Sequence, residues 1–468
     1  MEKVLEQLLD QYREEMIGDL CEVLKFETVT GEGTEDAPFG QTMNDCLNFI
    51  LKRAGEMGFT CENLDGYVGI IDNGEGEESV GVMTHIDVVP AGEGWTLPPY
   101  GGQISEDGYI YGRGTVDDKG PMIAALYACR AIKESGLPIK RSFRQIVGTD
   151  EETAFRCMKH YLKVYPQPTM GFSPDAQFPL IYIEKGIGHW EMLGQFNDVK
   201  EGDLILKSLD GGSVRNMVPD GAEAVFQVTE AGSQAVYTAL ENFTNKDKMT
   251  IKKCEDGQMV LKACGAPSHA SKPEQGDNAV ATLLRFLQSL TYAPSDACTT
   301  LNKLTDMVAY DYYGQGMGVA HEEEESGKLT LVGSVIKFDG SQFSLGVDTR
   351  YPIDLPTEQL KADLNAKVES IGLTFSPFDF KDSLYVPKDS TLVQTLMKVY
   401  QDFTGDIESR PLAIGGGTYA RAMKNFVAFG PVMPGGEERI HKVDERISCD
   451  DLIRLAKICC DALYRLAL

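Results

Sequence analysis

The sequence predicts an α/β fold in which a mostly parallel sheet is flanked by helices on both faces. One observation is the alternation of helical patterns, such as 41–57, with apolar runs near 66–72 and 79–84. A second is that histidine and acidic residues directly follow such runs, where an open α/β sheet has its binding crevice. The third is the length of 468 residues, which exceeds what one core usually supports and predicts two or three domains.

The first polar cluster follows the apolar run at 80–83, in the segment GVMTHIDVVP. His85 and Asp87 are two residues apart, so they lie on one side of an extended chain. One ring nitrogen of His85 is then available to a metal while Asp87 fixes the other nitrogen. The alternative is an ordinary polar strand end.

The second cluster, YGRGTVDDKGP, places Asp117 and Asp118 before a helical pattern that ends at Gly136. Pro121 in the first turn and Gly136 after the last turn fit the start and stop of a helix. One aspartate therefore has a structural alternative as the N-cap of this helix. The other aspartate stays free to bridge two cations.

The third cluster, VGTDEET, places Asp150, Glu151 and Glu152 after another buried strand pattern. Acidic residues in the first turn of a helix need no functional explanation. Because adjacent side chains diverge, however, one Glu is able to ligate a metal while its neighbour faces the water that the metal activates.

Further motifs follow in order: FSPDAQFP at 172–179, NMVP at 216–219, PSHAS at 267–271, GGGTYAR at 415–421 and a late His441. Together with the three clusters, these motifs resemble the PepV-type dipeptidases. This group belongs to the co-catalytic dizinc peptidases, which also include carnosinases, aminoacylases and desuccinylases. The resemblance spans nearly the whole chain, and it implies a zinc-peptidase-like catalytic domain with an inserted α+β lid domain.

The resemblance implies two divalent metal ions that share one ligand. His85 and Asp175 would complete the site of one ion, Glu152 and His441 would complete that of the other, and Asp117 would bridge them. Histidine and carboxylate ligands suit zinc, which is the first choice, but also manganese or cobalt. Two such ions would lower the pKa of a shared water and make it a nucleophile at neutral pH.

The same resemblance assigns residues that act beside the metals. Asp87 would orient His85, and Glu151 would be the general base. In the GGGT segment, Gly416 and Thr418 would contact the substrate, since a flexible backbone before a helix N-terminus attracts a carboxylate or an oxyanion. The alternative for this segment is a tight connection between a strand and a helix.

Three lid residues, Asn216, His269 and Arg350, would reach the substrate, with His269 stabilising the oxyanion and Arg350 binding a carboxylate. Each also has a purely structural explanation. Asn216 fits a turn, His269 fits an exposed loop, and Arg350 fits an ion pair with Asp348.

Changes of pattern near 186 and 378 divide the chain into three parts. We expect a first part of the catalytic domain at 1–186, an inserted lid at 187–378 with two ferredoxin-like halves, and a second catalytic part at 379–468. In relatives with a short lid, a neighbouring subunit supplies the lid histidine. The resemblance implies that this longer, doubled lid covers its own site, which predicts a monomer.

The net charge of −27 argues against binding to nucleic acid or to an anionic membrane. No run approaches 18 apolar residues, and the acidic amphipathic start MEKVLEQLLDQYREEM is unlike a signal peptide. The 11 cysteines are scattered without a C-x-x-C pair, which favours reduced thiols in a cytoplasm.

The resulting hypothesis is a metal-dependent dipeptidase that acts on small unblocked dipeptides. Within enzymes, the alternatives on the same site are an N-acyl amino acid deacylase, a desuccinylase or a carboxypeptidase. Outside enzymes, the alternative is a metal-binding scaffold without catalysis, which would be expected to have lost its base or a ligand.

Overall fold

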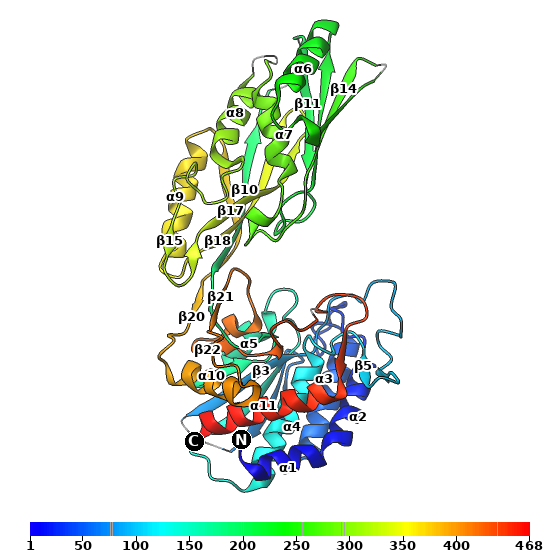
Figure 1. The fold of residues 1–468 in the computed structure, drawn as a ribbon, viewed down its shortest axis with the longest axis vertical. Coiled ribbons are helices and arrows are strands. Elements are labelled where there is room, and N and C mark those ends of the chain that lie inside the picture. The colour runs from blue at the N-terminus through cyan, green and yellow to red at the C-terminus, as the bar shows by residue number, and fades with distance from the viewer. Residues whose placement is uncertain are drawn as a thin grey trace. The chain divides into compact units, whose positions relative to one another are not determined.

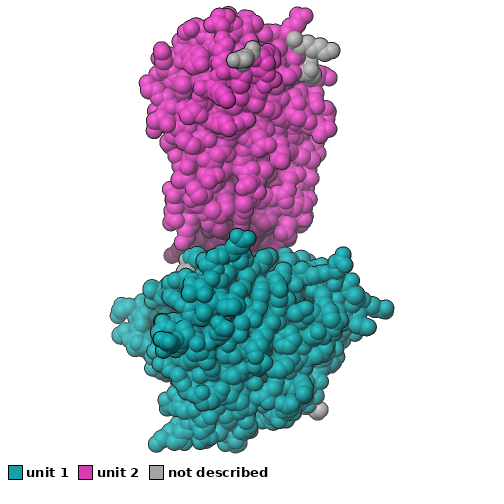
Figure 2. Space-filling view, turned by 90° about the vertical axis from the view of Figure 1, so that its right-hand side faces the viewer, with its two compact units in different colours: residues 1–183, 385–412, 417–468 teal, residues 184–384, 413–416 magenta. Residues whose placement is uncertain are grey.

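The computed structural model describes the chain except for positions 75, 77, 198, 200, 255, 292, 294 and 438. Its described residues form two compact units, which Figure 2 distinguishes by colour. Unit 1 consists of 1–183, 385–412 and 417–468, and unit 2 of 184–384 and 413–416. The domain boundaries expected at 186/187 and 378/379 stay a prediction. Gly416, expected in the last catalytic part, falls within unit 2.

Unit 1 is built on a mixed sheet, which confirms the predicted α/β class (Figure 1). The four central strands, β6, β3, β7 and β22, are mutually parallel, and antiparallel strands flank them on both sides. The strands in sheet order are β1 (Thr60–Leu64), β2 (Val68–Asn73), β6 (Ser142–Gly148), β3 (Ser79–His85), β7 (Met170–Ser173), β22 (Phe426–Ala428) and β9 (Ile181–Glu184). β20 (Leu384–Tyr385) and β21 (Leu412–Ile414) lie where the chain passes between the units.

Helices cover this sheet because their apolar stripes match its two faces. On one face, the side chain of Gln145 in β6 donates to the carbonyl of Met122 in α4. On the other face, Tyr419 lies over Gly148. The helices of unit 1 are α1 (Lys3–Gln11), α2 (Arg13–Val23), α3 (Gln41–Glu56), α4 (Lys119–Ser135), α5 (Arg156–Val164), α10 (Thr391–Thr404) and α11 (Cys449–Ala467).

Two small sheets lie beside the main one in unit 1. The first pairs β24 (Arg446–Ser448) with β5 (Tyr109–Tyr111), which also pairs with β4 (Gln103–Ile104). The second pairs β23 (Pro431–Val432) with β8 (Ala176–Gln177). These pairings tie the last 40 residues of the chain to segments more than 250 positions earlier.

Unit 2 contains an eight-stranded antiparallel sheet with helices packed against it. Its strands in sheet order are β13 (Met249–Lys253), β14 (Gln258–Cys264), β12 (Gly221–Val228), β11 (Leu204–Gly211), β17 (Thr330–Phe338), β18 (Gln342–Tyr351), β10 (Gly186–Gln195) and β19 (Thr374–Lys381). The helices are α6 (Glu230–Asn242), α7 (Ala279–Gln288), α8 (Asp296–Val308) and α9 (Thr357–Glu369). A short hairpin joins β15 (Glu322–Glu323) to β16 (Gly327–Lys328). The division into two ferredoxin-like halves stays a prediction.

Among the described residues, no helix combines the length and the apolar character that a bilayer crossing requires.

Candidate metal centre

Three ligand-bearing loops of unit 1 leave the same edge of the central sheet. β3 ends at His85, β6 ends at Gly148 shortly before Glu152, and β7 ends at Ser173 shortly before Asp175. β3 pairs in parallel with both β6 and β7, so the carboxyl ends of the three strands are neighbours. This arrangement places side chains that are far apart in sequence in one crevice.

The first group of candidate ligands is His85, Asp117 and Asp175, whose ligand atoms all lie within 4.8 Å of one another. Nε2 of His85 is 3.0 Å from Oδ1 of Asp117 and 3.6 Å from Oδ1 of Asp175. His85 is completely buried.

The second group is Asp117, Glu152 and His441. Nε2 of His441 is 3.1 Å from Oδ2 of Asp117 and 3.1 Å from Oε1 of Glu152. Asp117 therefore contributes one oxygen to each group. The structure brings together all five predicted ligands in the two sets that the resemblance implied.

The polar atoms of the first group fit a cation. Nε2 of His85 and Oδ1 of Asp117 are both buried and lie 3.0 Å apart, yet neither makes a hydrogen bond of good geometry with any described residue. Unpartnered buried polar atoms are costly, and their convergence indicates a ligand that satisfies them. A nitrogen and several carboxylate oxygens without thiolate form a donor set for zinc, manganese or cobalt.

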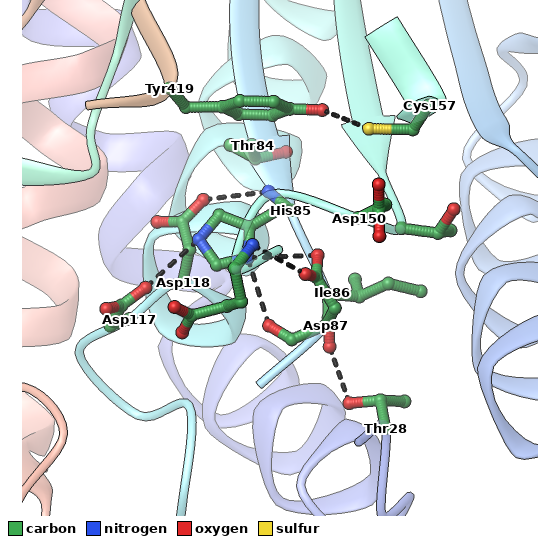
Figure 3. Close-up of polar contacts among 12 residues, drawn as sticks. Thr28, Thr84, His85, Ile86, Asp87, Asp117, Asp118, Asp150, Cys157 and Tyr419 are labelled. Atoms are coloured by element: carbon green, nitrogen blue, oxygen red, sulfur yellow. Dashed lines mark hydrogen bonds and ion pairs between the residues drawn. The ribbon is translucent and has the colours of Figure 1, made fainter. Parts of the chain in front are cut away.

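Neighbouring groups fix the orientation of His85, as Figure 3 shows. Its Nδ1 lies 3.0 Å from the carbonyl oxygen of Asp87 and 3.4 Å from the Oδ1 carboxylate oxygen of the same residue. Oδ2 of Asp87 accepts a hydrogen bond from the backbone of Glu152 at 2.9 Å. Asp87 thus contacts residues of both ligand groups, and its carbonyl contributes to the orientation together with its carboxylate.

Asp118 has the N-cap position of α4, but its side chain makes no capping bond. Its Oδ2 instead accepts from the backbone N–H of His85 at 3.0 Å. The N-cap alternative for this pair of aspartates is therefore wrong. Asp118 supports the end of β3, and Asp117 is left for the ligand groups.

The three acids of the third cluster have separate surroundings. Asp150 is buried and accepts three hydrogen bonds from Arg156, one from its backbone and two from its guanidinium group, so its role is structural. Burial and the negative charge of Asp175 raise the pKa of Glu151 well above its usual value. A raised pKa suits a group that takes up a proton near neutral pH.

Three further pKa values respond to the crowding of charge. Hydrogen bonds with Asp117 and Glu152 raise the pKa of His441 to about 10. Burial, followed by the charge of Asp117, raises the pKa of Asp175 to about 7. Burial alone would lower the pKa of His85, but the charge of Asp175 and the hydrogen bond with Asp117 outweigh it, so the pKa is raised. In the metal-free protein, protons therefore hold these ligands together.

Glu445, which no sequence motif singled out, is buried and contacts the loop that carries Asp117. Its carboxylate accepts hydrogen bonds from the backbone of Val116 and Asp117 and pairs with Arg113. The only sequence feature at this position is a run of mostly charged residues, HKVDER, that begins with the last ligand, His441. It gave no sign of burial.

In unit 2, His269 and Asn216 lie on adjoining segments that pair as antiparallel chains. The backbone N–H of Ala270 donates to the carbonyl of Asn216, and Met217 forms a bridge with His269. Nδ1 of His269 accepts from the backbone N–H of Ser271, which leaves its Nε2 as the position of the proton in the neutral ring. Partial desolvation, followed by the charge of Arg350, lowers the pKa of His269.

Arg350 is buried and forms a two-pronged ion pair with Asp348, with distances of 2.8 and 2.7 Å. Its Nη1 also donates to the carbonyl of Gly415 at 2.9 Å. The ion pair with Asp348, which was the structural explanation for Arg350, is therefore present in the molecule. These bonds use three of the five N–H groups of the guanidinium, so the geometry is compatible with a further carboxylate contact.

The segment after Gly417 differs from the expected helix. Tyr419–Ala422 forms a single 3-10 turn, and the hydroxyl of Thr418 caps it by accepting from the backbone of Ala420 at 3.2 Å. One short turn has no appreciable helix dipole, so the expectation of a helix N-terminus at this position is wrong. Gly415 instead permits close packing, since a side chain at this position would overlap Ser271.

The sequence model of peptidase family M20/M25/M40 matches residues 81–465. A Bacillus subtilis (strain 168) protein called "Putative dipeptidase YtjP" is 38% identical over 461 residues, which cover 97% of this chain and 98% of that protein. Aminoacylhistidine dipeptidase from Vibrio alginolyticus has a similar structure, with a TM-score of 0.58, 12% identity and 96% of each chain covered. The structure of human carnosine dipeptidase 1 is also similar, with a TM-score of 0.54, 13% identity and 100% of both chains covered. The two structural similarities concern the fold.

Proposed function

The chain belongs to peptidase family M20/M25/M40, and from this premise and its two ligand groups we propose that it hydrolyses small unblocked dipeptides. The observation that carries the proposal is the position of Asp117 in both groups. A shared carboxylate is the feature that a pair of neighbouring ions requires. The relatives named as dipeptidases support the substrate class.

We propose that two divalent ions bind here, zinc first, held by His85, Asp117 and Asp175 and by Asp117, Glu152 and His441. When bound, such ions polarise the carbonyl of the scissile bond and make water acidic enough to act as a nucleophile near neutral pH. Manganese and cobalt suit the same donor set.

Glu151 is the proposed general base. Its raised pKa lets it accept a proton from the attacking water and hold that proton near neutral pH. It then passes the proton to the amine that leaves. His269, neutral with its proton on Nε2, is the proposed donor to the developing oxyanion, a contact typically worth roughly 3 kcal/mol in the transition state.

Four residues are proposed to bind the substrate. Arg350 would use its remaining N–H groups for the C-terminal carboxylate, and Asn216, Gly416 and Thr418 would contact the backbone of the dipeptide. Because Asp348 and the Gly415 carbonyl already hold the guanidinium, Arg350 would be oriented before the substrate arrives.

We further propose a cytoplasmic monomer. All 11 cysteines are free thiols, as expected in a reducing compartment. The large insertion of unit 2 supports the hypothesis that one chain supplies every group at its own site. Light scattering of the metal-loaded protein tests the monomer, and an obligate dimer would refute it.

The deciding experiment is a substrate panel with metal-reconstituted protein. We expect hydrolysis of Ala-Ala, and little hydrolysis of N-acetyl-Ala or of a succinylated amine. Faster cleavage of either blocked compound would favour a deacylase or desuccinylase, and release of the terminal residue from long peptides would favour a carboxypeptidase. Metal binding without turnover of any of these compounds would favour the scaffold.

A further inference from the structure

Glu445 lies at the centre of a buried hydrogen-bond network in unit 1. Its side chain is 0% exposed, and it accepts hydrogen bonds from three backbone N–H groups of one loop. The backbone N–H of Gly114 lies 3.1 Å from each carboxylate oxygen, that of Val116 lies 2.8 Å from Oε1, and that of Asp117 lies 3.2 Å from Oε1. The last of these donors belongs to the residue that both ligand groups share.

Arg113 is the charged partner of Glu445 and is also buried. Its Nη1 lies 2.6 Å from Oε2 of Glu445 and 3.3 Å from the carbonyl oxygen of Lys442, the neighbour of His441. Its Nη2 lies 3.5 Å from the carbonyl oxygen of Pro90 and 3.4 Å from that of Ala91. The guanidinium thus contacts the segment that follows the β3 ligands and the segment that carries the last ligand.

We propose that Glu445, together with Arg113, is a positioning residue that sets the place of Asp117 relative to His85 and His441. This inference rests on the proposed metal-dependent function. Because Asp117 has one oxygen in each ligand group, a small shift of its backbone misplaces ligands of both ions at once. The loss of an ordinary ligand, such as Glu152, affects one group.

A purely structural role is the competing explanation, since removing one partner of a buried ion pair destabilises a protein. The chain offers a comparison in Arg144 and Asp72, a partly buried two-pronged pair with distances of 2.6 and 2.8 Å. This pair joins β2 to β6 near the start of β6, at the end opposite to the ligand loops. It supports unit 1 without contacting a ligand-bearing loop.

The test uses Glu445→Gln with Asp72→Asn as its control. Glutamine keeps the size of the side chain but removes its charge and places N–H groups where Glu445 accepts hydrogen bonds. The affinities of both zinc ions are measured by competition with a chromophoric chelator, and the stability of each metal-free protein is measured by urea unfolding. Neither measurement involves a substrate, so the result is independent of whether dipeptides are the substrate.

We expect Glu445→Gln to lower the affinity for each of the two ions by about 10- to 100-fold, the range found when outer partners of metal ligands are removed. Asp72→Asn should lose stability but keep both affinities within about twofold of wild type, because additivity holds for distant sites. Normal zinc affinity in Glu445→Gln, or an equal loss in Asp72→Asn, would overturn the proposal.

Arg113→Lys provides a second route if Glu445→Gln does not fold. Lysine keeps a positive charge near Glu445 but lacks the fork that reaches the carbonyls of Pro90, Ala91 and Lys442. We expect a weaker affinity for both ions, by several-fold. Wild-type affinity in a folded Arg113→Lys protein would overturn the role of the pair.

Discussion

Metal binding to this protein should release protons, and the structure indicates how many. In the metal-free protein at pH 7, His441 has a pKa of about 10, so its ring carries an extra proton, and the pKa of His85 is raised in the same direction. The pKa of Asp175 is about 7, so it carries roughly half a proton. Ligands must lose these protons before they bind a metal, so filling both groups should release at least about 1.5 protons, one from His441 and half of one from Asp175.

The sign of the pH dependence follows from the raised histidine pKa values. Protons compete with the metal below the folded-state pKa, so zinc affinity should rise with pH and level off near pH 10. Near neutral pH, the release of the His441 proton alone makes the combined affinity of both ions increase at least about tenfold per pH unit.

Calorimetric titration of the metal-free protein, in two buffers of different ionisation enthalpy at the same pH, counts the protons. His441→Gln should release about one proton fewer than wild type, because one histidine no longer titrates. His160→Gln should match wild type, since that ring stacks on Tyr67 and pairs with Asp65. Release of less than about one proton by wild type at pH 7 would refute the reasoning.

Three further predictions concern single positions. Glu151→Gln should retain both metals by elemental analysis while kcat falls by roughly 10²- to 10⁴-fold, and a near-normal kcat would remove Glu151 as the base. Arg350→Lys should raise KM about tenfold for dipeptides with a free carboxylate and leave amidated ones unchanged, because only a carboxylate uses the planar fork; equal effects on both would defeat this contact. Gly148→Ala should lower the free energy of unfolding by about 1–3 kcal/mol in urea, since the new Cβ would lie 1.8 Å from the Tyr419 hydroxyl oxygen. Gly18→Ala, with no atom within 4 Å of the new Cβ, should not destabilise the protein.

The central sheet was predictable because its residues follow simple periodicities. Apolar runs such as 79–84 gave β3, and the helical pattern that begins near Lys119 gave α4. The positions of His85 and of the acidic cluster at 150–152 after buried strands then followed from one rule about where parallel strands end. The local sequence pattern therefore also predicts the site geometry here, since the ligands lie at or directly after the ends of these strands. The ligand roles of Glu152, Asp175 and His441 came from the family resemblance.

The supporting residues were less predictable because their partners are distant in sequence. Glu445 reads as part of a charged surface loop, and only the pairing of β24 with β5 brings it to Arg113. In the same way, the sequence left open whether Asp118 caps α4, and the structure shows it bonded to the backbone of His85. The single turn after Thr418 was missed because a capping residue does not reveal how long the following helix is.

Unit 1 is interrupted by about 200 residues, and its final ligand, His441, follows this insertion. During synthesis, His85 and Asp117 leave the ribosome long before His441 and Glu445 do. The second ligand group therefore stays incomplete until the whole of the inserted unit has been synthesised. A growing chain that already holds one ion has no shared site, so hydrolytic competence is withheld until the segment that carries His441 has followed.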